Sequence, residues 1–278
     1  MKLGGVRESD NVQDRRGSPA KKGAVALSGT TVLIVLVLAV VTGKNPLELL
    51  SNVSGEATPT TQSAPADPND PEAIFARKIL ATTEDAWGQA LPKLGKPYRA
   101  PTLVLFRDAV QSACGFQKAA VGPFYCPGDS QAYVDLDFLD ALQKKLGAEG
   151  DFAKGYVIAH EIGHHVQNLL GTSKRVAGGG KDEGPTGSSV RLELQADCYA
   201  GVWGAYAKGK GLLEVGDVEE ALGAAAAIDD DTLQRRARGR VNPESFSHGT
   251  SAQRVRWFQR GMESGDPTRC DTFGAEEL

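Results

Sequence analysis

Histidine is scarce in this chain of 278 residues, which has only four. Three of the four lie within the six residues from His160 to His165. A solvated surface helix has no need of such a concentration, whereas a metal site does, because neutral imidazole is a favoured zinc ligand. The scarcity of histidine elsewhere makes this stretch the candidate functional site.

The chain also lacks an excess of basic residues. Its 31 Lys and Arg are outnumbered by 35 Asp and Glu, which gives a net charge of −4. Proteins that bind nucleic acid usually present a surplus of positive charge to the phosphates. The composition therefore argues against a nucleic-acid partner.

Charge is absent from residues 24–43, a run of 20 residues rich in Val and Leu. As a helix this run would span about 30 Å, the thickness of a bilayer core. A cleaved signal peptide is one alternative, but its apolar region would be only about 7–15 residues, and residues 41–44 lack its small-residue cleavage pattern. A buried core helix is another, but residues 30–41 show no polar face. We predict one uncleaved transmembrane helix.

The segments around this run predict the arrangement of the chain. Residues 1–23 are polar and basic, so we expect a disordered tail, and basic residues before a span favour a cytoplasmic N-terminus. Residues 44–70 are rich in Ser, Thr, Pro and Asp in their later part and indicate an extracytoplasmic linker. Residues 71–278 would then form one domain outside the cell membrane.

The histidine cluster contains the pattern H-E-x-x-H at residues 160–164. With 3.6 residues per turn, His160 and His164 project from one helix face within about 40° of each other. One divalent ion can bind both, and Glu161 flanks that face, where it can act as general base on a metal-activated water. His165 points about 140° away from His160, so it is a supporting residue rather than a ligand.

A third ligand is predicted from a second helix. Glu193 and Asp197 are four residues apart and therefore share a helix face. Glu193 could complete the zinc site, and Asp197 could accept the free ring N–H of a ligand histidine. A solvated pair of acids is the alternative, but the flanking residues are mostly apolar, and buried acids need a partner.

Five stretches together resemble the bacterial "putative neutral zinc metallopeptidase" family and, more distantly, the gluzincins typified by thermolysin. They are H-E-I-G-H-H at 160–165, E-L-Q-A-D-C-Y-A-G at 193–201, R-E-S-D-N-V-Q-D-R-R-G at 7–17, G-P-F-Y-C-P-G-D at 122–129 and S-F-S-H-G-T-S-A-Q-R at 245–254. The resemblance implies a membrane-anchored zinc peptidase with His160, His164 and Glu193 as ligands and Glu161 as base.

The predicted fold class is α+β, mainly helical, with a small sheet in a zincin-like domain. Residues 102–106 and 132–136 read as strands, and residues 71–91 and 137–147 as helices. Asp70 should cap the first helix, with Pro71 at its first position. In a zincin arrangement, an edge strand beside the cleft can pair with an extended substrate.

The four cysteines predict two disulfides outside the cytoplasm. Cys114 and Cys126 are close in sequence and should pair, which leaves Cys198 to pair with Cys270. Cys198 as a zinc ligand is the competing idea, but it points about 140° away from Glu193 on the helix.

His248 is the one histidine outside the predicted helix that carries H-E-x-x-H, and it precedes the capping-box pattern at residues 250–253. Gluzincins resembling thermolysin place a histidine near the developing oxyanion, so His248 is a candidate catalytic donor. A turn histidine that only bonds nearby backbone is the alternative, and Tyr199 and Tyr206 are rival donors.

Two functions remain open from the sequence. The first is a membrane-anchored, zinc-dependent endopeptidase that hydrolyses polypeptide through a metal-activated water. The second is a membrane-tethered binding or scaffold protein with a structural or vestigial zinc. Glu161 favours the enzyme, because a structural zinc site needs no general base.

Overall fold

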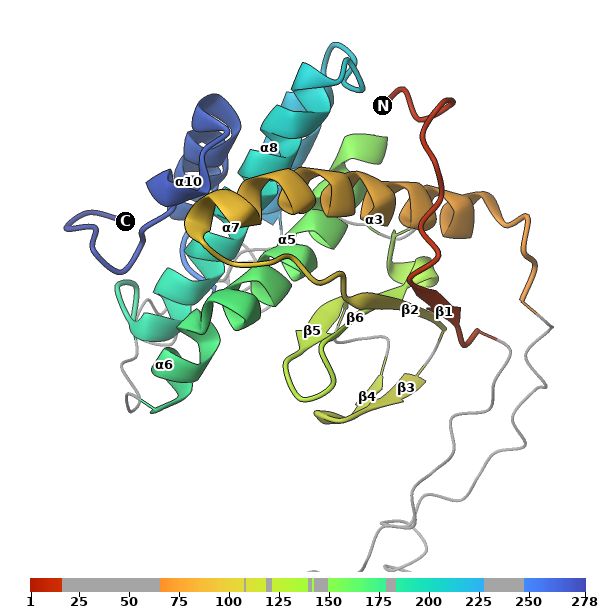
Figure 1. Ribbon diagram of the computed structural model, residues 1–278, viewed down its shortest axis with the longest axis horizontal. Helices are drawn as coiled ribbons and strands as arrows, with labels where there is room; N and C mark the ends of the chain where they lie inside the picture. The colour runs from red at the N-terminus through yellow and green to blue at the C-terminus, as the bar shows by residue number, and fades with distance from the viewer. Residues whose placement is uncertain are drawn as a thin grey trace, which may run out of the picture. The chain divides into compact units, whose positions relative to one another are not determined.

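The computed structural model describes residues 1–16, 66–107, 109–118, 122–139, 142, 150–178, 184–227 and 248–278. Residues 1–15 and 66–278 pack into one unit, and almost all of the second unit, residues 16–65, lies outside the described part. The first unit is mainly helical with a small sheet, as the predicted α+β class requires (Figure 1).

Four short strands form the main sheet, in the order β1-β2-β6-β5. They are β1 (Val12–Asp14), β2 (Thr102–Phe106), β6 (Gln131–Asp135) and β5 (Phe124–Cys126). The first three are parallel, and β5 runs antiparallel to β6 at the edge. Both predicted strands, β2 and β6, are buried at every position after the first, which is typical of strands covered on both faces.

A separate hairpin lies between β2 and β5 in the chain. It consists of β3 (Ala109–Ser112) and β4 (Gly115–Lys118), paired antiparallel. The Cys114–Cys126 disulfide joins the hairpin turn to the edge strand β5. The sequence analysis predicted this disulfide but none of the three strands it connects.

The helices lie to one side of the sheet (Figure 1). They are α3 (Pro71–Ala90), α5 (Asp151–Leu170), α6 (Thr172–Gly178), α7 (Ser188–Gly209), α8 (Asp217–Ala227) and α10 (Ser251–Ser264), with short 3-10 turns η1 (Leu91–Leu94) and η4 (Pro267–Arg269). Asp70 caps α3, and Thr250 forms a capping box with Gln253 at α10, as predicted. The predicted helix at 137–147 lies largely outside the described residues.

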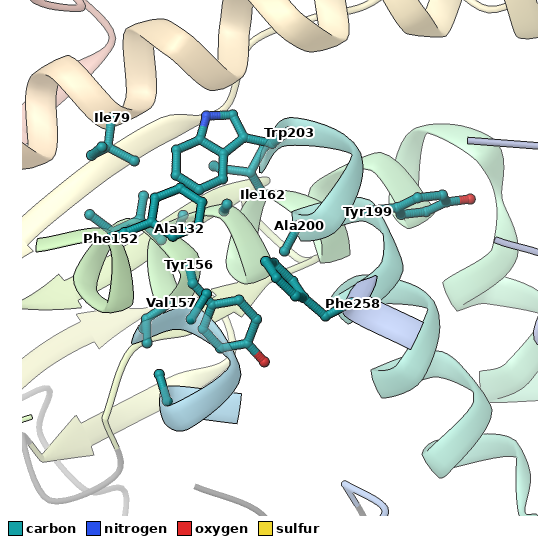
Figure 2. Close-up of a cluster of buried hydrophobic side chains, with 14 of the residues drawn as sticks. Ile79, Ala132, Phe152, Tyr156, Val157, Ile162, Tyr199, Ala200, Trp203 and Phe258 are labelled. Carbon is teal, nitrogen blue, oxygen red and sulfur yellow. The ribbon is translucent and has the colours of Figure 1, made fainter. Parts of the chain in front are cut away.

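One hydrophobic core joins the helices to the sheet. Figure 2 shows Ile79 of α3, Phe152 of α5, Trp203 of α7 and Phe258 of α10 converging in it. Each of these side chains is fully buried, and the Phe152 and Trp203 rings stack with centroids 5.2 Å apart. Burial of such large apolar side chains fixes α5 against α7, the two helices that carry the predicted site.

Residues 1–15 pack on this core, so the prediction of a disordered tail is wrong for them. Strand β1 extends the sheet beside β2. Arg7 forms ion pairs with Glu84 and Asp85 of α3 at 2.9 and 2.8 Å, and Ser9 donates a hydrogen bond to Glu84. Backbone pairing and buried contacts outweigh the polar composition that suggested disorder.

This packing also bears on the predicted membrane topology. A single crossing by residues 24–43 would place residues 1–16 and residues 66–278 on opposite sides of the bilayer, where they could not share one sheet. The predicted span itself lies outside the described residues. Among the helices that the structure does describe, none is long and apolar enough to cross a membrane.

Candidate metal centre

The H-E-x-x-H motif lies in α5, a helix held by its apolar face. Phe152, Tyr156, Ile162 and Val166 recur at helical spacing and are completely buried. The helix ends at Gly171, which has a φ of 83° and accommodates the left-handed cap. This confirms the predicted stop and places the motif in the middle of a rigid helix.

A glycine lets α7 approach α5 closely. A Cβ atom on Gly163 would lie 2.8 Å from the backbone oxygen of Ala196 and 3.0 Å from its Cα atom. Only a residue without a side chain fits this contact. Because Ala196 lies between Glu193 and Asp197 on α7, the contact brings both acids within reach of the histidines.

Three side chains from the two helices converge on one point. The Nε2 atoms of His160 and His164 lie 3.2 and 3.6 Å from the two carboxylate oxygens of Glu193. The three ligand atoms all lie within 4.8 Å of one another. Two imidazoles and one carboxylate are a typical protein ligand set for a catalytic zinc, which keeps a further position open.

Behind His160 lies a buried charged network. The Nδ1 atom of His160 is 2.8 Å from Asp197, whose carboxylate also accepts a hydrogen bond from the Tyr156 hydroxyl at 2.6 Å. Arg254 of α10 donates to both oxygens of Asp197 at 2.8 Å. Asp197 therefore fixes the ring of His160 with Nε2 toward Glu193, which is the role predicted for it.

These carboxylates control the protonation of the histidines. Burial alone would lower the pKa of His160, but Asp197 and Glu193 outweigh it and raise the pKa to about 10. The pKa of His164 is also raised, because Glu193 overcomes the effect of burial. Burial would raise the pKa of Glu193, but the two histidines hold it well below its usual value.

The charge of the site fits a divalent cation. With neutral imidazoles, Glu161, Glu193 and Asp197 contribute three negative charges, and Arg254 contributes one positive charge. Without metal, the raised pKa values of His160 and His164 favour protonated rings that offset the remaining two negative charges, and a cation must replace those protons once the rings are neutral ligands. A zinc ion between the Nε2 atoms and Glu193 would neutralise the two negative charges, so the residues present fit the metal.

Glu161 lies beside the three candidate ligands and is not part of the cluster that they form. Only 8 % of its surface is exposed. Burial raises the pKa of its carboxyl, while the nearby imidazoles of His160 and His164 partly oppose the shift. A raised pKa suits a group that must accept a proton near neutral pH and later release it.

His248 is exposed and lies just before the cap of α10. The next residue, Gly249, has a φ of 94°, and a Cβ atom there would lie 3.2 Å from Val190 and 3.4 Å from Leu194 of α7. The turn therefore contacts the part of α7 that carries Glu193. The catalytic role of His248 stays a prediction.

The remaining predicted residues have structural places. The structure contains the disulfides Cys114–Cys126 and Cys198–Cys270. Cys198 is therefore not a metal ligand. The ring of His165 faces the sheet, with Nε2 2.6 Å from the Arg99 carbonyl and Nδ1 3.1 Å from the Tyr125 hydroxyl.

Sequence reasoning missed four buried polar residues around the ligands, namely Tyr156, Gln167, Gln195 and Arg254. Arg254 could have been found from the sequence. A buried Asp197 requires a cation, and Arg254 is the last residue of the stretch at 245–254 that resembles the family. The two glutamines gave no signal, because most of their partners, Leu192 and the Cys270 carbonyl among them, lie far away in the sequence.

Comparisons with known proteins identify the family of this chain. A family model described as "Putative neutral zinc metallopeptidase" matches residues 1–273. The chain belongs to this family. The family is one of zinc peptidases, so zinc is the cofactor, and the resemblance inferred from the sequence motifs is confirmed.

Two bacterial relatives have similar lengths. The "Uncharacterized protein YpfJ" of Escherichia coli K12 is 50% identical over 286 residues, which cover 99% of both chains. The "Uncharacterized protein Rv2575" of Mycobacterium tuberculosis H37Rv is 44% identical over 218 residues, which cover 73% of this chain and 74% of the relative. No solved structure matches the chain.

Proposed function

We propose that this zinc metallopeptidase is an endopeptidase that hydrolyses peptide bonds through a metal-activated water. The observation that carries the proposal is the convergence of His160, His164 and Glu193, with Glu161 buried beside them. Zinc in such a site activates water and polarises a carbonyl as a Lewis acid. A purely structural zinc site would not need Glu161, so its presence supports a catalytic site over a structural one.

The chain's own residues divide the work. Glu161 accepts a proton from the attacking water on its carboxylate oxygen and passes it to the leaving amine. Asp197 holds the Nδ1–H of His160, which keeps Nε2 directed at Glu193. His248 is the proposed additional donor to the developing oxyanion, supported by the close approach of the adjacent Gly249 to Val190 and Leu194 of α7.

The proposed substrate is an extended polypeptide. Strand β5 is at the edge of the sheet, and its Tyr125 contacts His165 and Asn168 of the metal helix. An edge strand can pair with a substrate backbone and so present a peptide bond beside the metal helix. An edge strand that binds substrate beside the metal-binding helix is the arrangement expected of a zincin-like peptidase.

We also propose that the domain acts outside the cytoplasm, in contact with the cell membrane. The two disulfides support the first part, because cytoplasmic thiols stay reduced. The uncharged residues 24–43, which lie outside the described part of the chain, support the second. Since residues 1–15 pack on the domain, the proposal places both on the same side of the membrane.

The test uses the full chain with Glu161→Gln. The variant should retain zinc, because Glu161 is not a ligand, and lose peptide hydrolysis by several orders of magnitude. Zinc content is measured by atomic absorption and hydrolysis with a peptide library. Glu219→Gln, an exposed change on α8, is the matched control and should have wild-type activity.

The alternative is a non-catalytic binding or scaffold protein with a structural zinc. It predicts that the zinc-loaded wild-type chain cleaves no peptide in the library. Full hydrolysis by zinc-bound Glu161→Gln would instead show that another residue is the base.

A further inference from the structure

The two proposed histidine ligands have chemically different partners on their Nδ1 atoms. His160 is paired with the anionic Asp197, as described above. His164 instead has its Nδ1 atom 2.9 Å from the Oε1 atom of Gln167, one turn further along α5. Because an amide oxygen only accepts, His164 donates from Nδ1, which leaves Nε2 for the metal.

The orientation of the Gln167 amide is fixed from its other end. Its Nε2 atom donates to the Leu192 carbonyl at 2.6 Å and to the Oε1 atom of Gln195 at 3.2 Å. If the amide were reversed, its oxygen would face these two acceptors, and its NH2 group would face His164. That reversal would favour the tautomer with the proton on Nε2, which blocks metal binding.

Gln195 is fixed in the same way by the C-terminal segment. Its Nε2 atom donates to the Cys270 carbonyl at 2.9 Å, and Cys270 is joined to Cys198 of α7 by a disulfide. Gln167 has no exposed surface, and Gln195 is 6 % exposed. Water therefore has little access to replace these hydrogen bonds.

We propose that Gln167 and Gln195 are positioning residues for the metal. They form a directional amide chain from the Cys270 carbonyl to His164, and this chain sets the ring orientation and tautomer of the second histidine ligand. The inference rests on the proposed function of His164 as a zinc ligand. The Cys198–Cys270 disulfide then also contributes to the metal site, because it holds in place the Cys270 carbonyl that accepts the hydrogen bond of Gln195.

A neutral partner on His164 also has an electrostatic consequence. A second carboxylate at this position would add negative charge to a site that one zinc ion already balances. Gln167 supplies the acceptor that His164 requires without that extra charge. Asp197 of α7 and Gln167 of α5 therefore orient the two histidines of α5 by different means within one buried site.

The test compares Gln167→Met, Gln195→Met and the double variant in the full chain. Zinc dissociation constants are measured by competition with a chromophoric chelator, and melting temperatures are measured without metal. Gln167→Met should weaken zinc binding about 10- to 100-fold, as loss of such a partner typically does. Gln195→Met should weaken it less, because the His164–Gln167 contact survives.

The double variant is decisive for the chain of contacts. Because Gln195 acts through Gln167, the double variant should bind zinc about as weakly as Gln167→Met alone. The absorption spectrum of bound Co2+ should change in Gln167→Met, since it reports ligand geometry that a general loss of stability would not alter. Gln259→Met, exposed on α10, is the matched control and should match wild type.

Three outcomes would overturn the inference. The first is wild-type zinc affinity in Gln167→Met, and the second is a double variant whose effect is the product of the two single effects. The third is wild-type zinc affinity in Gln195→Met. This variant tests the inference even if Gln167→Met fails to fold. Wild-type zinc affinity in His164→Ala would be a different failure, because it would remove the proposed metal site itself.

Discussion

Arg254 provides the positive charge that balances Asp197 inside the protein. Its guanidinium donates to both carboxylate oxygens and to the Tyr156 hydroxyl, and its exposed fraction is 2 %. Burial would lower the pKa of Arg254, but Asp197 outweighs it and raises the pKa well above its usual value. The hydrogen bonds around the proposed zinc site are therefore part of the folded core as well.

Replacing Arg254 with Met should destabilise the protein strongly. The change leaves Asp197 buried without its cation, which typically costs about 3–5 kcal/mol. The measurement is the free energy of unfolding by chemical denaturation, with zinc affinity measured in parallel.

The same helix offers a matched control. Arg256→Met removes an ion pair with Glu277 that is largely exposed, so the expected change is about 0–1 kcal/mol. Equal destabilisation by the two variants would contradict the assigned role of Arg254.

At the scale of elements, the spacing of three helices depends on glycines. Gly163 lets α5 meet the backbone of α7 at Ala196. On the other side of α7, a Cβ atom on Gly201 would collide with the Phe258 carbonyl of α10. These close contacts hold Glu193 and Asp197 of α7 between the histidines of α5 and Arg254 of α10.

Gly163→Ala should separate α5 from α7, although alanine is the better helix former. The added methyl group has no space beside Ala196, and overpacking of this kind costs about 1–3 kcal/mol. Because Glu193 moves with α7, zinc affinity should fall as well. Calorimetric melting and chelator competition measure the two effects.

Gly88→Ala on α3 is the control for helix propensity. No atom lies within 4 Å of the added methyl group at that position. Its stability should rise by up to about 1 kcal/mol, with unchanged zinc affinity. A rise in stability and normal zinc binding in Gly163→Ala would disprove the close-contact argument.

At the scale of the whole molecule, residues 1–15 and residues 66–278 form one folded unit. The strand pairing of Val12 with Leu103 and the contacts of Arg7 and Ser9 with Glu84 join them. The family match also begins at residue 1 and so includes this segment. Both parts must therefore lie in the same compartment.

Cysteine labelling tests this placement. Gly5→Cys and Glu219→Cys introduce single thiols at exposed positions of the two parts, while the native cysteines are held in disulfides. Both should react with a membrane-impermeant maleimide before the membrane is permeabilised. Reaction of Glu219→Cys alone would restore a single crossing between them, and reaction of neither would place the whole unit in the cytoplasm.

Local chemistry explains which parts of this structure the sequence could predict. Helical spacing placed His160, Glu161 and His164 on α5 and paired Glu193 with Asp197, because the period of a helix is fixed by backbone geometry. The caps at Asp70 and Thr250 and the stop at Gly171 follow from the same short-range rules. The family motifs added zinc as the metal.

Contacts between distant segments decided the rest. The pairing of β1 with β2, the charge of Arg254 on Asp197 and the amide chain from Gln195 through Gln167 to His164 each join residues far apart in sequence. The polar composition of residues 1–15 suggested disorder. The hydrogen-bond partners that order this segment lie in α3 and β2, which its local sequence does not reveal. A sequence pattern records what each residue can do, and only the packed helices and sheet determine which partner it meets.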